Sequence, residues 1–204
     1  MILALAAGAL AVPACGGGGE RQDENEPEGE FPVAVTEASF PERQLISETT
    51  DLRIAVENTG DEAVPDLATT ISVDRGAIGA FSTRTEGADL ADPNRPVWIL
   101  DAKSPRLAGE TKPSGLSGAT TAATNTYAFG PLEPDETTEM VWRLTAVRGG
   151  DYTVRYGVAA GLQGNAVAVG ADGEPVRGAI PVSIDPRAPT SRVNGKGQVV
   201  TQGP

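Results

Sequence analysis

Few side chains in this sequence are able to do chemistry, because it contains no histidine and only one cysteine, Cys15. Catalysis by Ser-His-Asp or Cys-His pairs, histidine-ligated zinc and histidine pH switches are therefore excluded. A single cysteine permits neither an internal disulfide nor a cysteine-based metal cluster. The two methionines, Met1 and Met140, offer haem or copper almost no ligands. We therefore expect no cofactor.

Oxygen-bearing side chains gather in residues 86–101, where Ca²⁺ would find its preferred ligands. They are Glu86, Asp89, Asp92, Asn94 and Asp101. The twelve-residue order of an EF-hand is missing, so we interpret the segment as a solvated acidic loop and expect no metal ligands. A divalent-cation-dependent enzyme, or enzyme accessory, that uses this loop stays open as an alternative function.

Two pairs of carboxylates are candidates for the acid and the nucleophile of a glycosidase. They are Glu133 with Glu136, and Glu136 with Glu139. Both pairs lie in a turn and the strand expected after it, where charged residues mostly serve solubility. We expect no catalytic residues in this chain and interpret it as a non-enzyme.

The N-terminus contains an uncharged apolar stretch, residues 2–12, followed directly by Val12-Pro13-Ala14-Cys15. A membrane-spanning helix needs about 20 apolar residues, so this stretch has the length of a signal-peptide core instead. A small residue before the cysteine resembles the lipobox of bacterial lipoprotein signal peptides. That resemblance implies that Cys15 receives diacylglycerol and that the chain is cut before it.

We therefore predict a signal peptide at residues 1–14 and a lipid anchor on Cys15 at the outer face of the cytoplasmic membrane. No Lys or Arg precedes the apolar stretch, and Pro13 departs from the lipobox pattern. Cleavage after Ala14 with secretion, or a buried apolar strand, remain the alternatives.

Residues 15–30 combine a run of four glycines with six acidic residues against one arginine. Such a segment buries little apolar surface, so we predict a lipidated, disordered acidic tether. The net charge of the whole chain is −12. We expect no nucleic-acid partner and contact with the membrane only through the anchor, because both surfaces repel an acidic protein.

Residues 31–184 show short alternating apolar runs separated by turn signals, which is typical of a single β-sandwich. The expected strands include 33–38, 52–56, 67–73, 97–100, 126–129, 140–146, 152–158, 166–169 and 180–184. No long helical period occurs. Residues 185–204 contain three prolines and several Gly, Asn and Gln, so we predict a disordered C-terminal tail.

Four sequence segments resemble the immunoglobulin-like adhesion modules called CARDB domains. They are Val56-Glu57-Asn58-Thr59-Gly60, the turn at residues 130–136, Trp142, and Gly150-Asp151-Tyr152-Thr153-Val154. Asp135 stands where these turns usually have Gly, and we expect it to adopt the left-handed conformation. The resemblance implies an all-β, immunoglobulin-like antiparallel sandwich, here with a long inserted loop region and disordered termini.

The inserted region between Asp74 and Tyr127 is longer than a minimal sandwich needs, and long loops on a rigid scaffold often bind partners. Arg95, Trp98 and Arg106 are the candidate contact residues, although the few aromatic residues of the chain favour interpreting Trp98 as core, with a binding platform as the alternative. We predict a lipid-anchored, monomeric, non-enzymatic module that binds an envelope protein or polymer or serves in surface adhesion or assembly. A purely structural spacer is the second alternative.

Overall fold

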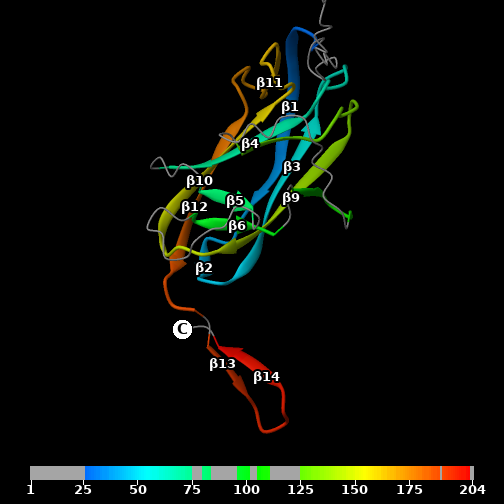
Figure 1. Cartoon of the computed structure of the whole chain (residues 1–204). Coiled ribbons are helices and arrows are strands. Elements are labelled where there is room, and N and C mark those ends of the chain that lie inside the picture. Colours follow the sequence, from blue (N-terminus) through cyan, green and yellow to red (C-terminus); the bar gives the residue numbers. More distant parts are fainter. Residues whose placement is uncertain are drawn as a thin grey trace, which may run out of the picture.

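The computed structural model describes residues 26–74, 80–83, 96–101, 105–110, 125–188 and 190–202. Two β-sheets lie face to face, and a separate two-stranded hairpin projects from one end of them (Figure 1). The described residues include no helix, and so none long and apolar enough to cross a membrane. The all-β sandwich predicted from the sequence is confirmed.

The first sheet has the spatial order β11-β1-β3-β9-β6-β5, with β7 also paired to β9. Its strands are β1 (Gly29–Ser39), β3 (Thr49–Asn58), β5 (Phe81–Thr83), β6 (Trp98–Leu100), β7 (Arg106–Leu107), β9 (Thr137–Ala146) and β11 (Ala166–Val169). The second sheet has the order β2-β12-β10-β4-β8. Its strands are β2 (Arg43–Leu45), β4 (Ala68–Val73), β8 (Asn125–Ala128), β10 (Gly150–Ala159) and β12 (Arg177–Asp185).

The connectivity is that of an immunoglobulin domain. Strands β1, β3, β9 and β6 take the places of A, B, E and D in one sheet, and β4, β10 and β12 those of C, F and G in the other. The sheets are mixed, which corrects the expectation of a purely antiparallel sandwich. The pairs β1–β11, β2–β12 and β5–β6 are parallel.

The inward faces of the two central strands of the first sheet build the core, and Ala55 and Val141 on their other face are buried as well. Leu52 and Ile54 of β3 stand opposite Trp142 and Met140 of β9, and all four side chains are fully buried. Thr69 of the second sheet donates its hydroxyl to the Met140 sulfur, so the sheets also meet through a polar contact. The predicted inward faces of β3 and β9 are therefore correct.

Asn58 ties the end of β3 to the turn before β9. Its buried side-chain amide donates to the carbonyls of Glu62 and Leu132, while its Oδ1 accepts from Gly60 N. Asp135 N donates to the Asn58 carbonyl, and Asp135 has φ 60°. The left-handed conformation predicted for Asp135 is thus confirmed.

The turn between β9 and β10 carries a tyrosine corner formed by Tyr152. Its hydroxyl donates to the Gly149 carbonyl at 3.0 Å, at the start of the F-equivalent strand. Gly149 also approaches Pro186 so closely that a Cβ there would collide with the proline ring. These contacts fix the point at which the chain leaves the sandwich.

Both predicted ends of the domain differ from the structure. Strand β1 starts at Gly29, before the boundary predicted at Phe31, and the described residues begin at Glu26. The tail predicted as disordered instead contains the hairpin β13 (Thr190–Val193) and β14 (Val199–Gln202). Asn194 accounts for the hairpin, since its side-chain oxygen accepts from two backbone amides within the turn.

Candidate functional site

Three arginines meet on the outer face of the first sheet around Asp51. The contacts to its Oδ2 are from Arg53 at 3.1 Å and Arg106 at 3.6 Å, and Arg143 lies 3.6 Å from Oδ1. Arg53 also binds Glu139 at 2.6 Å. We call Arg53, Arg106, Arg143 and their carboxylate partners Asp51, Asp101 and Glu139 the arginine cluster.

Strand alternation and register explain why these side chains converge. Asp51 and Arg53 occupy the positions of β3 that alternate with its buried leucine and isoleucine, so they point outward. The pairing of β3 with β9 places Asp51 opposite Arg143. Arg106 arrives from β7, whose backbone pairs Arg106 with Val141 of β9. The cluster is therefore a cross-strand arrangement, which stabilises sheets when opposite charges face each other.

Charges in the cluster balance within themselves, with three cations and three carboxylates. The hydrogen bond from Arg53 to Glu139 raises the pKa of the Arg53 guanidinium, while partial burial works against this. Asp51 is the most enclosed member, with 19% of its side chain exposed, and its Oδ1 has no hydrogen-bond partner among the described residues.

Arg143 is the member with most freedom to meet a ligand. Its side chain is 57% exposed, and its two ionic contacts, to Asp51 and Asp101, are 3.6 and 3.4 Å long. An arginine held at that length keeps N–H groups available for a bidentate contact with a carboxylate or phosphate. Arg143 therefore gives the cluster a group whose chemistry suits anion recognition.

The three predicted contact residues do not form one site in the structure. Arg95 lies outside the described residues. Trp98 is fully buried, with its ring stacked on Phe81 at 5.4 Å. Its side chain therefore belongs to the core, which is the interpretation that the sequence favoured, and the alternative of a contact residue at Trp98 is corrected. Arg106 faces outward and joins the arginine cluster.

The long region between Asp74 and Tyr127 supplies strands as well as loops. It contributes β5, β6 and β7 at the edge of the first sheet and most of β8 at the edge of the second. Its remaining segments, 75–79, 84–95, 102–104 and 111–124, lie outside the described residues, as does Cys15. The acidic loop is described only at its end, where Asp101 accepts from the Thr145 hydroxyl. No group of three potential metal-ligating side chains occurs among the residues the structure describes.

The carboxylates considered for catalysis have structural contacts. Glu136 accepts a hydrogen bond from the backbone N–H of Glu133, within the turn before β9. Glu139 binds Arg53 in the arginine cluster. Neither pair presents two free carboxylates to a common space.

A second feature is a shallow hollow of about 750 Å³ on the side formed by β2, β10 and β12. Acidic side chains from Glu42, Asp74 and Asp151 line it together with Arg43. Asp74 is bound by Arg155 of β10, so part of this charge is already compensated. The hollow is open and polar, and we rank it below the arginine cluster as a binding site.

Sequence reasoning missed Asp51, Arg53 and Arg143, although the alternation already indicated that the two arginines point outward. The missing information was the register between β3 and β9, which are about ninety residues apart. A signal was present in the matching pattern of opposite charges on two strands, but only pairing reveals which charges meet.

No family model and no curated protein matches the sequence. Among solved structures, a CARDB domain from Pyrococcus furiosus in complex with di-metal ions is similar, with a TM-score of 0.40 and 11% identity over 76% of this chain and 86% of that one. A cohesin module of a Clostridium perfringens family 33 glycoside hydrolase gives 0.40 and 11%, over 77% of this chain and 98% of that one.

Native α2-macroglobulin of Escherichia coli, from domain MG7 to the C-terminus, gives a TM-score of 0.43 and 16% identity over 77% of this chain and 17% of that one. The likeness to all three concerns the β-sandwich fold alone.

Proposed function

We propose that this chain is a lipid-anchored, non-enzymatic β-sandwich module at the outer face of a bacterial cytoplasmic membrane. It is held there through Cys15, and it binds an envelope protein or polymer that carries carboxylates or phosphates. The observation that supports this function is the placement of Glu26, the first described residue, and of the exit of β12 at opposite ends of the sandwich.

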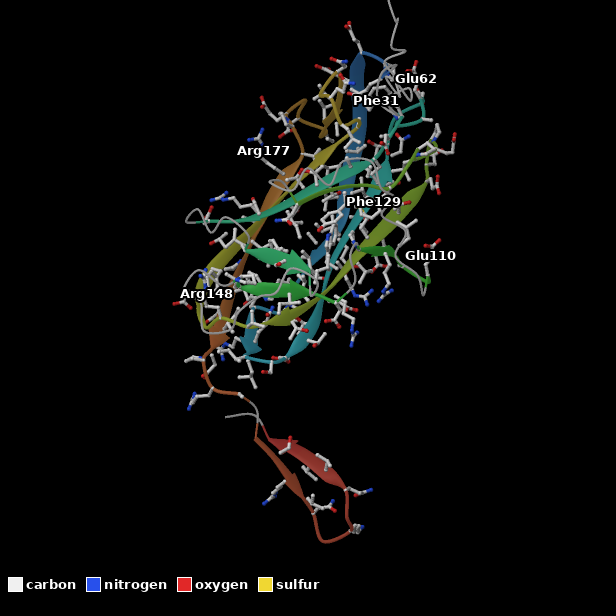
Figure 2. The ribbon with its side chains drawn as sticks, viewed as in Figure 1. Phe31, Glu62, Glu110, Phe129, Arg148 and Arg177 are labelled. Atoms are coloured by element: carbon white, nitrogen blue, oxygen red, sulfur yellow. The ribbon has the colours of Figure 1, made fainter. Side chains whose placement is uncertain are left out.

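The length of strand β10 gives the separation of these two ends. Its first residue, Gly150, pairs with Ile184 near the C-terminal exit. Its last residue, Ala159, leads directly into the loop that contacts Glu26. The ten residues of β10 span roughly 30 Å at about 3.3 Å per residue. Phe31, near the first described residue, and Arg148, near the C-terminal exit, accordingly lie toward opposite ends in Figure 2.

A module anchored at its first end holds its other features away from the lipid surface. The hairpin β13–β14 then projects from the distal end, as the ribbon in Figure 1 shows. The arginine cluster lies on the side of the first sheet, where Arg143 is the most exposed cation. In a chain of net charge −12, this face is the part suited to an anionic partner.

Two experiments test the two parts of this function. The full chain is expressed in a lipoprotein-processing bacterium with an alkyne fatty acid, and Cys15→Ser serves as the comparison. We expect label and membrane retention in the wild type and neither in Cys15→Ser. Equal labelling of both proteins, or none in either, would contradict the anchor.

The binding part is tested with matched charge reversals in the anchored protein. Arg143→Glu alters the arginine cluster, while Arg177→Glu alters an exposed arginine of β12 outside it. In-cell crosslinking should give a partner adduct that Arg143→Glu loses and Arg177→Glu keeps. If both variants retain the adduct, the arginine cluster is not the binding face. If the wild type gives none, the chain acts as a spacer.

A further inference from the structure

The carboxylate of Glu26 accepts hydrogen bonds from four backbone amides of one loop. Oε2 accepts from Leu162 N at 2.7 Å and Gln163 N at 2.8 Å. Oε1 accepts from Asn165 N at 2.8 Å and Ala166 N at 2.9 Å. Hydrogen bonds of this length to an ionised acceptor are charge-assisted, and four of them fill most of the acceptor positions of a carboxylate.

The loop is shaped for the carboxylate by two glycines. A Cβ on Gly161 would overlap the Glu26 carboxylate, so only glycine leaves the space in which it lies. Gly164 has φ +88°, a left-handed conformation that favours glycine and turns the chain between the two pairs of donors. The donors are all backbone N–H groups converging on one point, which is the arrangement of an anion-binding nest.

Burial and hydrogen bonding act on Glu26 in opposite directions. Partial desolvation raises its pKa, but the four backbone hydrogen bonds together outweigh it, and the pKa lies below 4.5. Asp66, which lies two residues before β4, interacts with Glu26 through its like charge. Its own pKa is raised by burial first and then by the charge of Glu26, while its bond from Gly130 N lowers it. The loop therefore holds an ionised carboxylate despite a neighbouring acid.

The segment that follows Glu26 pairs with a different strand from the rest of β1. Gly29 to Pro32 pair in parallel with β11, and Gly29 N donates to the Asn165 carbonyl. From Val33 onward β1 pairs with β3 instead. Residues 26–31, which we call the strap, thus make their backbone pairing with β11, while the Phe31 side chain lies in the core. The Pro32 carbonyl accepts from Thr59 N, where the chain joins the β1–β3 ladder.

We propose that the loop of residues 161–166 is a carboxylate-binding site in its own right and that Glu26 is its ligand from the same chain, locking the acidic tether to the sandwich. The loop recognises a carboxylate through backbone N–H groups, and none of these four donors is a cationic side chain. Beyond the lock, ten residues separate Glu26 from Cys15, a reach of at most about 35 Å when fully extended. The lock holds whether or not Cys15 carries lipid.

Chemical rescue in the full chain tests the proposal. Glu26→Ala empties the site, and sodium acetate is added as the probe, with acetamide and sodium chloride at equal concentration as controls. Backbone amide NMR and hydrogen exchange report on the four donor amides. Glu28→Ala removes a neighbouring exposed acid and serves as the matched variant.

In Glu26→Ala we expect the exchange of the four donor amides to accelerate at least tenfold, and acetate alone to shift them saturably. Wild type and Glu28→Ala should keep slow exchange and show no acetate shift at these amides. Adding Gly161→Ala to Glu26→Ala should abolish the acetate response, because the new methyl group fills the site. Unchanged exchange in Glu26→Ala, or equal shifts with acetate and acetamide, would overturn the proposal.

Discussion

The indole N–H of Trp98 donates to the side-chain carbonyl of Gln44 at 2.8 Å, and both residues are buried. Trp98 belongs to β6 of the first sheet and Gln44 to β2 of the second, so this bond crosses the sandwich. The Gln44 amide in turn donates to the Pro41 carbonyl. The ring that the sequence offered as a partner contact thus joins the two sheets.

Replacing Trp98 by Phe should cost more stability than replacing Trp142 by Phe. Trp98→Phe leaves the Gln44 oxygen buried without its donor, which costs about 1–3 kcal/mol in addition to lost packing. The Nε1 of Trp142 has no hydrogen-bond partner among the described residues, so Trp142→Phe removes no such bond. Denaturant unfolding of the two variants measures the difference. Equal losses would mean that the Trp98–Gln44 bond contributes nothing net.

Trp142→Ala should destabilise the sandwich by roughly 3–5 kcal/mol, because the ring is fully buried between the sheets. Tyr127 and Phe129 contact it edge-on at centroid distances of 6.2 and 6.0 Å, so truncation opens a cavity that three rings now close. Chemical denaturation gives the change in unfolding free energy. A loss below about 1 kcal/mol would contradict the core position of this ring.

Alternation was enough to predict which way the long strands face. Leu52 and Trp142 lie inward as their positions in period-two runs indicated, and the turn residues Asn58 and Asp135 behave as their types suggest. Strands β2, β5 and β7 were missed because two or three residues carry no periodicity. Their existence depends on the long strands they pair with.

Glu26 was missed for a different physical reason. Its partners are backbone amides 136 to 140 residues away, and backbone groups leave no mark in a sequence. An acidic run beside glycines therefore looks solvated. For the C-terminal hairpin a signal did exist, since Asn194-Gly195 between two valine-containing runs is a typical hairpin turn. The surrounding prolines and polar residues outweighed it.

Asp51→Asn should destabilise the protein by about 1–3 kcal/mol, because it leaves three arginines short of their shared carboxylate. Asp172→Asn, in an exposed turn away from the arginine cluster, is a control that keeps the same change in net charge. Urea unfolding at low and high salt measures both variants. The loss for Asp51→Asn should shrink with added salt, and a loss equal to that of the control would show that the cluster is not held by Asp51.

The stabilisation from Glu26 should depend on pH in the acidic range. Its folded pKa lies below the ordinary value of 4.5, so the ionised carboxylate favours the folded state above that pH. This contribution is lost as the pH falls from about 4.5 through the folded pKa, where the unfolded state already binds the proton.

The stability difference between wild type and Glu26→Gln should accordingly be constant near neutral pH and shrink below about 4.5. Urea midpoints measured from pH 7 to pH 3 provide the curve. In the same variant the pKa of Asp66 should fall, because the charge of Glu26 no longer raises it. A difference that grows on acidification would contradict the lock.

The hairpin β13–β14 should behave as an independent element. Its exposed valines, Val193 at 67% and Val199 at 71%, stand opposite each other without cover from the sandwich. A two-stranded hairpin without a packed face is marginally stable in water. Limited proteolysis should therefore cut first within residues 186–202 and leave a resistant fragment that begins near Glu26 and ends near Asp185.

The near-ultraviolet circular dichroism of that fragment should match the full chain, because the aromatic rings all lie within residues 31–156. Mass spectrometry identifies the ends. A resistant fragment that retains Val199 would show that the hairpin docks on the sandwich, and cleavage between Glu26 and Phe31 would show that the strap does not hold.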